Sequence, residues 1–514
     1  MQPSAFSCRT IRQEYPVTTT HALFNASAVA DVDAHLSGLL SEHVTALFER
    51  PPDSERGLEI AVWKVVIEVG AALLTACLAL ACWRVTERAT GGRPVRLRLD
   101  EDYILGRSTT FGPLKVPLFA YRDGPVTRCP ARREVFPLHP KCRSSVLLLE
   151  WEARLGSQLP FRQAEDGLEF FSHGAVHTED TTISRHIGVI GPLLDHTWTS
   201  RTREDVSDLL VNRATRDRKT GRPLVYVSTD AHALRRYVDD TWKAEQKMIN
   251  GIRLWCIDDH TGQTLHLGGE YTWGDCREVA ARMQALIELL PTDDAAPQVV
   301  LVADGMPWIR DHVFPVMPDG TQFILDFYHL AQRLARYAAD KYGANTKKAR
   351  AWVRRIVTPL TGKRPYRRKT LKTRRGHRKN RGRRRDPFRT VHPSAHPHGT
   401  GDDLMWTLIE GEPDSEALDE LIGYVGANLD RIDYASYREH GMQIGSGAME
   451  SLHRVASQMR LKLAGARWTA SRATAVLNFR LMLLANRWDA FWSQADISGT
   501  LAMAFGSATV PSPA

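Results

Sequence analysis

The sequence predicts an α/β protein, with a core domain in which helices flank a mixed β-sheet, a helical insertion inside that domain, and helical regions before it. The main observation is the order of the apolar patterns after residue 216, which change between strand length and helix length. The segments are strands at 224–229, 252–257 and 264–267, a helix at 278–290, a strand at 299–303, a short helical stretch at 308–314, a strand at 322–325 and a helix at 327–342. A second observation is the polar, arginine-rich stretch that follows, which interrupts these patterns until about residue 437.

Turn-forming residues at 258–262 predict a hairpin, so the first three strands are expected to be antiparallel. Three antiparallel strands, a helix, and then strands that alternate with helices form the element order of a ribonuclease-H-like domain. We therefore predict a ribonuclease-H-like core over 216–342 and 437–492, with an insertion at 343–436 and a tail at 493–514.

Bulk composition is that of an ordinary soluble protein. At 514 residues the chain is too long for one hydrophobic core, so about three domains are expected. It has 43% hydrophobic and 25% charged residues. The seven cysteines are scattered and odd in number, which does not predict a disulfide framework, and the start of the chain has no secretory signal pattern. We expect a cytoplasmic location.

The first 95 residues have helical patterns and end at a Gly-Gly-Arg-Pro turn. Within them, 69–83 is an uncharged apolar run bounded by Glu68 and Arg84. A membrane span needs roughly 20 apolar residues. We therefore expect a buried or dimer-forming helix here rather than a membrane span.

Residues 96–215 predict a small β element followed by a candidate helix-turn-helix. Helical patterns at 161–171 and 178–190 flank a glycine-containing turn. The second helix of such a motif can enter the major groove of DNA. Arg185 and His186 are the expected donors to DNA from that helix. A helical hairpin that belongs to the core is the alternative.

Cysteines offer at most half of a zinc site. Cys129 and Cys142 flank His139, but the chain has no Cys-x-x-Cys pair. Unliganded cysteines fit this pattern better.

The arginine-rich window, residues 363–389, holds fifteen Lys/Arg and one acid, Asp386. Its net charge is +14 in a chain of +9, so the rest of the chain carries −5. Like charges interrupted by glycine and proline leave too little apolar surface to fold alone, so we expect order only on contact with an anion such as DNA. A solvated loop or an RNA-binding segment is the alternative. The arginines expected to contact DNA are Arg367, Arg368, Arg374, Arg375, Arg383, Arg384 and Arg385.

Three carboxylates lie at predicted ends of core elements. Asp230 follows the first strand, Asp304 follows the strand at 299–303, and Glu450 lies in a helix opened by Gly-Ser-Gly. Hard divalent cations prefer carboxylate oxygens, and two such ions can assist phosphodiester cleavage and transfer. The predicted sheet order would bring these residues to one site for two Mg²⁺ or Mn²⁺ ions. Strand-ending turns and a capping box are the structural alternatives.

Asp326 and His329 lie three residues apart where the helix at 327–342 begins. The histidine can contact a phosphate or support a metal ligand. A satisfied pair at a helix start is the alternative.

Five segments carry a resemblance to a known family: DGMPWIRDHVFP, QFILDFYHLAQRL, IGSGAMES, RLKLAGARWT and NRWDAFW. They are similar to segments of bacterial insertion-sequence transposases of the ISKra type, within the Mutator-like DDE group. The resemblance covers about residues 93–492 and is strongest after Leu224. It implies a DDE enzyme that cuts DNA at the terminal inverted repeats of its element and joins the freed 3′-hydroxyls to new DNA. The implied triad is Asp230, Asp304 and Glu450, and Asp326 and His329 match the family's D-x2-H motif.

The resemblance further implies Mg²⁺ or Mn²⁺ as cofactor, terminal-repeat and target DNA as partners, a homo-oligomer on DNA without a membrane, and association with the nucleoid. The chain departs from the family in two places. Ala231 follows the first aspartate, where glycine is expected, and the cysteine-rich knuckle is reduced to Cys129. A decayed copy that only binds DNA, or a metal-dependent nuclease that does not join ends, are the alternatives.

Overall fold

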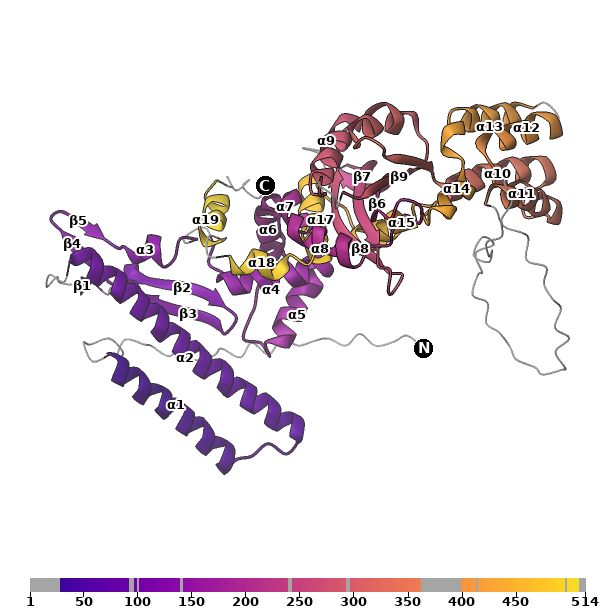
Figure 1. The fold of residues 1–514 in the computed structure, drawn as a ribbon. Helices are drawn as coiled ribbons and strands as arrows, with labels where there is room; N and C mark the ends of the chain where they lie inside the picture. Colours follow the sequence, from indigo (N-terminus) through magenta and orange to yellow (C-terminus); the bar gives the residue numbers. More distant parts are fainter. Residues whose placement is uncertain are drawn as a thin grey trace. The chain divides into compact units, whose positions relative to one another are not determined.

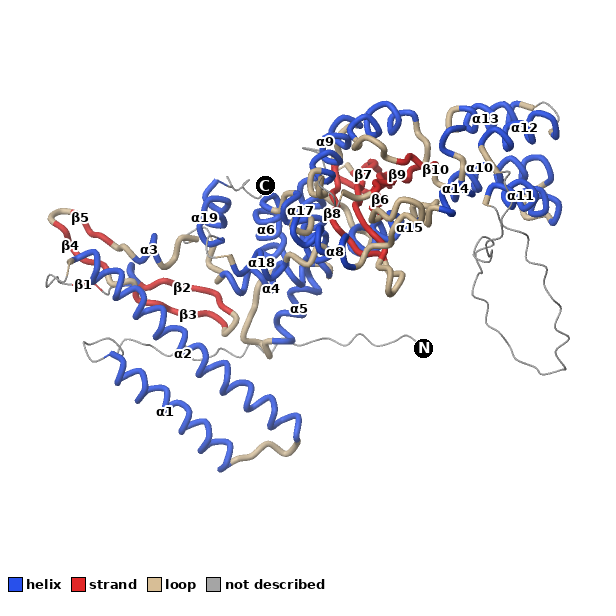
Figure 2. Tube along the Cα trace, in the orientation of Figure 1, coloured by secondary structure: helices blue, strands red, loops and turns tan. Residues whose placement is uncertain are grey.

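The structure, a computed structural model, describes residues 28–91, 97–98, 101–138, 142–238, 243–292, 296–361, 399–412, 415–494 and 497–507 (Figures 1 and 2). By packing, the chain divides into two compact units. The first comprises Met1–Leu155, Phe161–Ile183 and Ala495–Ala514, and the second comprises Gly156–Pro160 and Ser184–Gln494. The division into five regions made from the sequence stays a prediction.

The first unit begins with two neighbouring helices, α1 (Ala28–Glu49) and α2 (Glu55–Thr90) (Figure 1). The hydroxyl of Ser54 accepts a hydrogen bond from the Gly57 backbone N–H and caps the start of α2. Gly91 ends α2 in the left-handed conformation, with φ at 62°. α2 and the glycine that ends it therefore lie where the sequence predicts them.

Among the described residues, α2 is the one helix long and apolar enough to cross a membrane by length and composition. Its most apolar 18-residue window has a mean hydropathy of 2.3 and is 28% buried. The C-terminal half packs on the small β element through Ala79 and Cys82. Because core helices of soluble proteins pass the same test, α2 alone is weak evidence for a membrane span.

The β element of the first unit consists of a two-stranded and a three-stranded sheet. Its strands are β1 (Leu97–Arg98), β2 (Ile104–Thr109), β3 (Gly112–Pro117), β4 (Ala120–Asp123) and β5 (Val126–Arg128). Leu105, Leu114 and Val116 of the β2–β3 hairpin are buried against α2. The other helices of the first unit are α3 (Ala131–Glu134), most of α4 (Val146–Gln158), α5 (Phe161–Phe171) and, near the end of the chain, α19 (Ile497–Ser507). The boundary between the units falls inside α6 (Asp180–Ile190), whose residues from Ser184 belong to the second unit.

The second unit is built on a five-stranded mixed sheet in the order β10-β9-β6-β7-β8. Its strands are β6 (Leu224–Tyr237), β7 (Ala244–Ile257), β8 (Thr264–Thr272), β9 (Gln298–Ala303) and β10 (Gln322–Leu325). Pairing is antiparallel between β6, β7 and β8, and parallel between β6, β9 and β10. The predicted mixed α/β class is confirmed.

Helices cover both faces of this sheet (Figure 2). Successive strand residues point to opposite faces, so Val225 and Val227 pack with α8 and α9, whereas Leu224 and Tyr226 pack with α10 to α14. On the first face lie α8 (Arg203–Asn212), α9 (Cys276–Ile287) and a π-helix (Ile309–Val313), with α7 (His196–Thr199) beside β8. On the second lie α10 (Phe327–Tyr342) and α14 (Tyr434–Glu439). Helices α11 (Lys347–Leu360), α12 (Gly401–Gly411) and α13 (Glu416–Gly426) pack on α10 and on one another and extend this hydrophobic cluster beyond the sheet.

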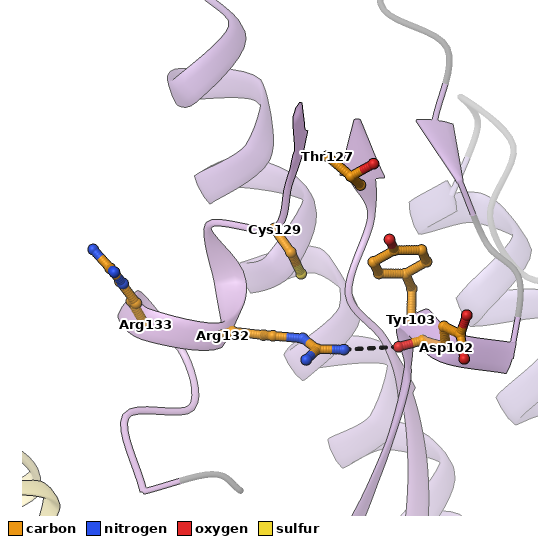
Figure 3. Close-up of a pocket in the computed structure, with 6 residues that line it drawn as sticks. All are labelled: Asp102, Tyr103, Thr127, Cys129, Arg132 and Arg133. Carbon is orange, nitrogen blue, oxygen red and sulfur yellow. Dashed lines mark hydrogen bonds between the residues drawn. The ribbon is translucent and has the colours of Figure 1, made fainter. Parts of the chain in front are cut away.

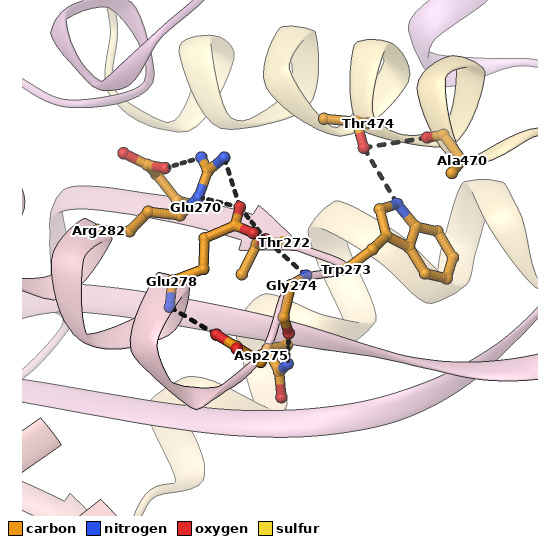
Figure 4. A network of polar contacts seen from close by, with 10 residues as sticks. Glu270, Thr272, Trp273, Gly274, Asp275, Glu278, Arg282, Ala470 and Thr474 are labelled. Carbon is orange, nitrogen blue, oxygen red and sulfur yellow. Dashed lines mark hydrogen bonds and ion pairs between the residues drawn. The ribbon is translucent and has the colours of Figure 1, made fainter. Parts of the chain in front are cut away.

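The last part of the second unit returns to the sheet. Its elements are α15 (Gly447–Leu452), a π-helix (His453–Gln458), α16 (Met459–Leu461), α17 (Ala470–Leu484) and α18 (Trp488–Ser493). Helix α15 packs on β6 and β7, and α17 packs on β8. Figure 4 shows the polar contacts that hold β8 in place, where Trp273 donates to Thr474 of α17 and Arg282 of α9 pairs with Glu270.

Three strands, β6, β7 and β8, are clearly longer than the sequence predicts. β6 runs on to Tyr237, so Asp230 lies within the strand and not at its end. β6 extends this far because β7 pairs with it as far as Ala244↔Tyr237. The parallel partner β9 stops pairing with β6 at Val227↔Leu301. Asp230 therefore lies three residues beyond the last parallel pair of β6 and β9. Although Asp230 is inside a strand, it lies next to the end of β9, as the predicted strand-end position would.

Candidate active site

One row of residues crosses the sheet at the position of Asp230. Asp230 pairs with Gly251 of β7, and Gly251 pairs with Tyr271 of β8. On the other side, Asp304 continues the β6–β9 register, since both aspartates lie three residues beyond the pair Val227↔Leu301. Asp326 continues the β9–β10 register, one residue beyond Ala303↔Leu325.

All three aspartates belong to one face of the sheet. Alternation places Asp230 on the side of Tyr226, and Asp304 on the side of Val302. That is the face covered by α10. Two positions predicted from separate sequence segments are thus neighbours, because a parallel register aligns the strands that carry them.

Both aspartates are partly buried, and the charge of Asp230 acts on Asp304. Oδ1 of Asp304 accepts a hydrogen bond from the Met306 backbone N–H at 3.0 Å. Burial raises the pKa of Asp304 above its usual value, and the charge of Asp230 adds to this rise. Burial also raises the pKa of Asp230, but His453 lowers it further and leaves it below its usual value. The rise that Asp230 adds to the pKa of Asp304 agrees with the strand register, which makes the two residues neighbours.

Glycine at position 305 allows the turn after Asp304. Its φ is +76°, and a Cβ atom there would lie 2.5 Å from Leu325 Cδ1 and 2.8 Å from Asn428 Oδ1. The Asp304-Gly305 pair is therefore a tightly packed strand end with a partly buried acidic side chain, rather than a loose turn.

Helix α10 brings positive charge to the aspartates. His329 lowers the pKa of both Asp230 and Asp304, and Arg333, one turn further along α10, lowers that of Asp304. Arg333 also stacks on the ring of Tyr424, 4.1 Å from its centroid. The Tyr424 hydroxyl donates to the backbone carbonyl of Asp304 at 2.7 Å. Sequence patterns did not single out Arg333 or Tyr424.

Asp326 is a structural residue in this arrangement. It is 1% exposed and caps α10 by accepting hydrogen bonds from the backbone N–H groups of Tyr328 and His329. Its second oxygen accepts from the Ser446 N–H at 2.6 Å. Asp326 therefore fits the structural alternative, in which its carboxylate accepts hydrogen bonds at the start of the helix. His329 is partly exposed and faces the two aspartates.

Glu450 lies exposed in the first turn of α15. The buried Arg253 of β7 holds this helix by donating to the carbonyl of Ala448. Within the described ranges, no three His, Cys, Asp or Glu side chains converge closely enough to hold a metal ion. The structure therefore brings Asp230 and Asp304 together, and the role of Glu450 as a third ligand stays a prediction.

His453 is a site residue that sequence patterns did not reveal. It lies one turn after Glu450, where a π-helix begins, and its Nε2 lies 3.5 Å from Oδ2 of Asp230. Its Nδ1 is 3.1 Å from the Tyr271 hydroxyl. A π-helical turn is often found at functional sites, but such a turn has no sequence signature that would have identified this histidine.

The candidate helix-turn-helix has both of its helices, α5 and α6, joined by a turn with positive φ at His173 and Gly174. Arg185 is exposed on α6. His186 is 2% exposed, so its predicted role as a donor to DNA is wrong for this conformation. The reason is helical periodicity, because His186 shares the buried stripe of Ile183, Ile187 and Ile190.

Cys129 lines an open pocket of about 380 Å³ in the first unit (Figure 3). The pocket residues are Asp102, Tyr103, Thr127, Cys129, Arg132 and Arg133. Burial raises the pKa of the Cys129 thiol. Cys142 is buried, and His139 lies outside the described residues. The seven arginines predicted to bind DNA in the arginine-rich window also lie outside them.

No protein-family model matches the chain, and no curated protein matches it. Among solved structures, the chain is similar to the Drosophila P element transposase strand transfer complex, with 10% identity and a TM-score of 0.32. That similarity covers 69% of this chain and 93% of the other. A likeness of this size carries no weight for fold or function, so the chemistry of the site itself must support any function.

Proposed function

We propose that the chain is a DNA transposase that binds terminal inverted repeats and performs strand cleavage and strand transfer at Asp230 and Asp304. The observation that supports this most strongly is the register of the two aspartates on adjacent parallel strands. The strand order β10-β9-β6-β7-β8, with three antiparallel and two parallel members, is also that of a ribonuclease-H-like sheet. The sequence segments that resemble ISKra-type transposases contain Asp304, Asp326 and Glu450.

The donor set fits hard divalent cations such as Mg²⁺ or Mn²⁺. Asp230 and Asp304 supply carboxylate oxygens from neighbouring strands, and hard cations prefer such ligands. Two such ions, when bound, would activate the attacking oxygen and stabilise the leaving oxygen of a phosphodiester. In this proposal Glu450 completes the ligand set from α15.

The protein groups around the pair have roles that follow from their charge and position. His329 and Arg333 lie on the side of α10 that faces the carboxylates, where they can bind phosphate oxygens of the DNA strand. Tyr424 holds the backbone of Asp304. Asp326 fixes the loop before α15 and thereby the helix that carries Glu450.

The test is nicking of a supercoiled plasmid that carries the DNA flanking the gene, in Mg²⁺ or Mn²⁺. Asp230→Asn, Asp304→Asn and Glu450→Gln should each abolish nicking while duplex binding persists, because an amide oxygen is a poor substitute for an ionised ligand. Asp319→Asn is the matched control, since Asp319 is exposed on the turn before β10. It should nick at the rate of the unchanged protein.

Each outcome has a definite meaning. Nicking by Glu450→Gln at the unchanged rate would remove Glu450 from the site and leave the aspartate pair. Nicking by all three variants would overturn the proposed enzyme and leave a DNA-binding protein. A pre-cut end with a free 3′-hydroxyl separates the remaining classes, because a nuclease that cannot join ends would leave it unjoined to target DNA.

A further inference from the structure

A buried cluster lies beneath Asp230. His453 is 3% exposed and Tyr271 is 1% exposed. The His453 ring contacts the ring of His232 in a T-shaped arrangement, with centroids 4.4 Å apart. His232 in turn has its Nε2 2.8 Å from the hydroxyl of Ser457. Nε2 of His453 is the end of this cluster that reaches Asp230, 3.5 Å from its Oδ2.

Gly251 makes room for this cluster. It lies between Tyr271 and Asp230 in the row of paired residues. A Cβ atom at position 251 would lie 2.6 Å from Met449 Cε, 2.7 Å from His453 Cε1 and 2.9 Å from Tyr271 Cε1. The missing side chain thus lets the segment after α15 approach β7, and the His453 ring occupies the gap between Tyr271 and Asp230.

The Tyr271 hydroxyl determines which nitrogen of His453 carries the proton. Burial raises the pKa of Tyr271 well above its usual value, so the hydroxyl stays protonated. Among the residues that the structure describes, Nδ1 of His453 is its only hydrogen-bond partner. If Nδ1 carried the proton, the buried hydroxyl hydrogen would have no acceptor, at a cost of about 1–3 kcal/mol. The hydroxyl therefore donates to Nδ1, and the imidazole proton lies on Nε2.

The proton on Nε2 points toward an acceptor. Oδ1 of Asp230 already accepts from the Ala231 N–H at 2.8 Å, whereas Oδ2 lies 3.5 Å from Nε2 of His453. That nitrogen is buried and, within the described part of the chain, has no hydrogen-bond partner. A small movement of either side chain brings the pair to an ordinary N–H···O distance of about 2.9 Å.

We propose that Tyr271 and His453 form a positioning relay that holds the Asp230 carboxylate in its binding orientation. Tyr271 fixes the Nε2–H tautomer of His453, and this N–H directs Oδ2 of Asp230 while Ala231 directs Oδ1. The consequence for metal binding rests on the proposed function, but the tautomer itself does not. Outer-shell partners of this kind typically change metal affinity or activity about 10–100-fold when removed.

The tautomer can be observed without any reaction. In full-length protein labelled with ¹⁵N-histidine, a long-range ¹H–¹⁵N spectrum distinguishes the Nε2–H form from the Nδ1–H form and from imidazolium. The His453 signals are identified by their loss in His453→Gln. We expect the Nε2–H form in the unchanged protein and a mixture in Tyr271→Phe. An Nδ1–H form or imidazolium in the unchanged protein would overturn the relay.

The positioning role is tested by Mn²⁺ binding, followed as loss of the free-ion electron paramagnetic resonance signal, and by nicking kinetics. Tyr271→Phe and His453→Phe should weaken Mn²⁺ binding and lower kcat about 10–100-fold, with the KM for DNA unchanged. His453→Gln, which retains a side-chain N–H, should recover part of the loss. Tyr434→Phe is the matched control, because Tyr434 is a fully buried tyrosine whose hydroxyl has no partner among the described residues.

Failure of the relay and failure of the proposed function give different results. If Asp230→Asn abolishes nicking but Tyr271→Phe binds Mn²⁺ and nicks as the control does, the relay is wrong and the function stands. If Asp230→Asn changes neither Mn²⁺ binding nor nicking, the proposed function fails, and the spectrum still decides the tautomer. Thermal melting identifies a variant that fails to fold, and Tyr271→Phe then remains as the conservative test.

Discussion

The buried carboxylate of Asp326 accepts a hydrogen bond from the backbone N–H of Ser446, 2.6 Å away and 120 residues later in the chain. The same carboxylate caps α10, which carries His329 and Arg333. One side chain therefore ties the helix that faces the aspartate pair to the loop that opens α15. Asp326 thus supports the site by holding α10 and the loop before α15 in place.

Asp326→Ala should destabilise the second unit by roughly 2–4 kcal/mol, because it removes an N-cap and leaves the buried Ser446 N–H without an acceptor. Denaturant unfolding measures this loss. Asp319→Ala, on an exposed turn, should leave the unfolding midpoint unchanged. An equal midpoint for Asp326→Ala would mean that another acceptor replaces the carboxylate.

Gly251→Ala should impair the site more than it impairs folding. The added Cβ meets ring atoms of His453 and Tyr271, and overpacking of this kind costs about 1–3 kcal/mol. Nicking and Mn²⁺ binding should fall together as His453 is displaced. Gly106→Ala is the control, since Gly106 also lies in a strand but has open space at its Cβ position. Unchanged Mn²⁺ binding in Gly251→Ala would show that the helix after α15 can shift without affecting Asp230.

Glu412 should make the stability of the helical insertion depend on acid pH. Its carboxylate is 1% exposed and accepts hydrogen bonds from Lys341, Trp352 and Tyr337. Burial raises its pKa, but these donors lower it further, so the folded-state pKa lies below the usual value. The stabilisation is therefore present above the unfolded pKa of about 4.3 and is lost as pH falls through the folded pKa.

Glu412→Gln should lower stability at pH 7 by about 1.5–3 kcal/mol and flatten the fall in stability below about pH 5. Urea unfolding from pH 3 to pH 7 measures both effects. Glu410→Gln, an exposed neighbour, should keep the unchanged protein's profile. A parallel pH profile for Glu412→Gln would assign the acid sensitivity to other carboxylates.

Arg185→Ala should reduce the preference for terminal-repeat DNA over scrambled duplex, because Arg185 is exposed on the second helix of the helix-turn-helix candidate. Fluorescence anisotropy with both duplexes gives the ratio of affinities. Arg162→Ala, on the first helix α5, should weaken both complexes alike through phosphate contacts. An unchanged ratio in Arg185→Ala would assign α5 and α6 to the core alone.

Deletion of residues 363–389 should flatten the plot of log affinity against log salt for a random duplex. Each phosphate neutralised by the arginine-rich window contributes about 0.9 to that slope. A variant with every arginine in the window changed to lysine keeps its net charge of +14 and should keep the slope. Equal slopes for the deleted and intact proteins would mean that the window does not contact DNA.

Local patterns in the sequence determined the elements and the class of the fold. β10 and α10 have the predicted bounds, Gln322–Leu325 and Phe327–Tyr342, because apolar periodicity and an aspartate at a helix start are local features. The order of strands and helices predicted a mixed sheet for the same reason. Asp304 could be identified as a strand-end carboxylate from its own segment, without knowledge of its neighbours.

Tertiary structure alone decided which polar groups meet. β6 extends past Asp230 because β7 pairs with it, and His186 is buried because its helix turns that side inward. His453 and Asp230 lie more than two hundred residues apart in the chain, and the missing side chain at Gly251 leaves room for their contact. Strand register and the burial of a polar side chain depend on partners that are distant in sequence, so no local pattern could have predicted the contact of His453 with Asp230.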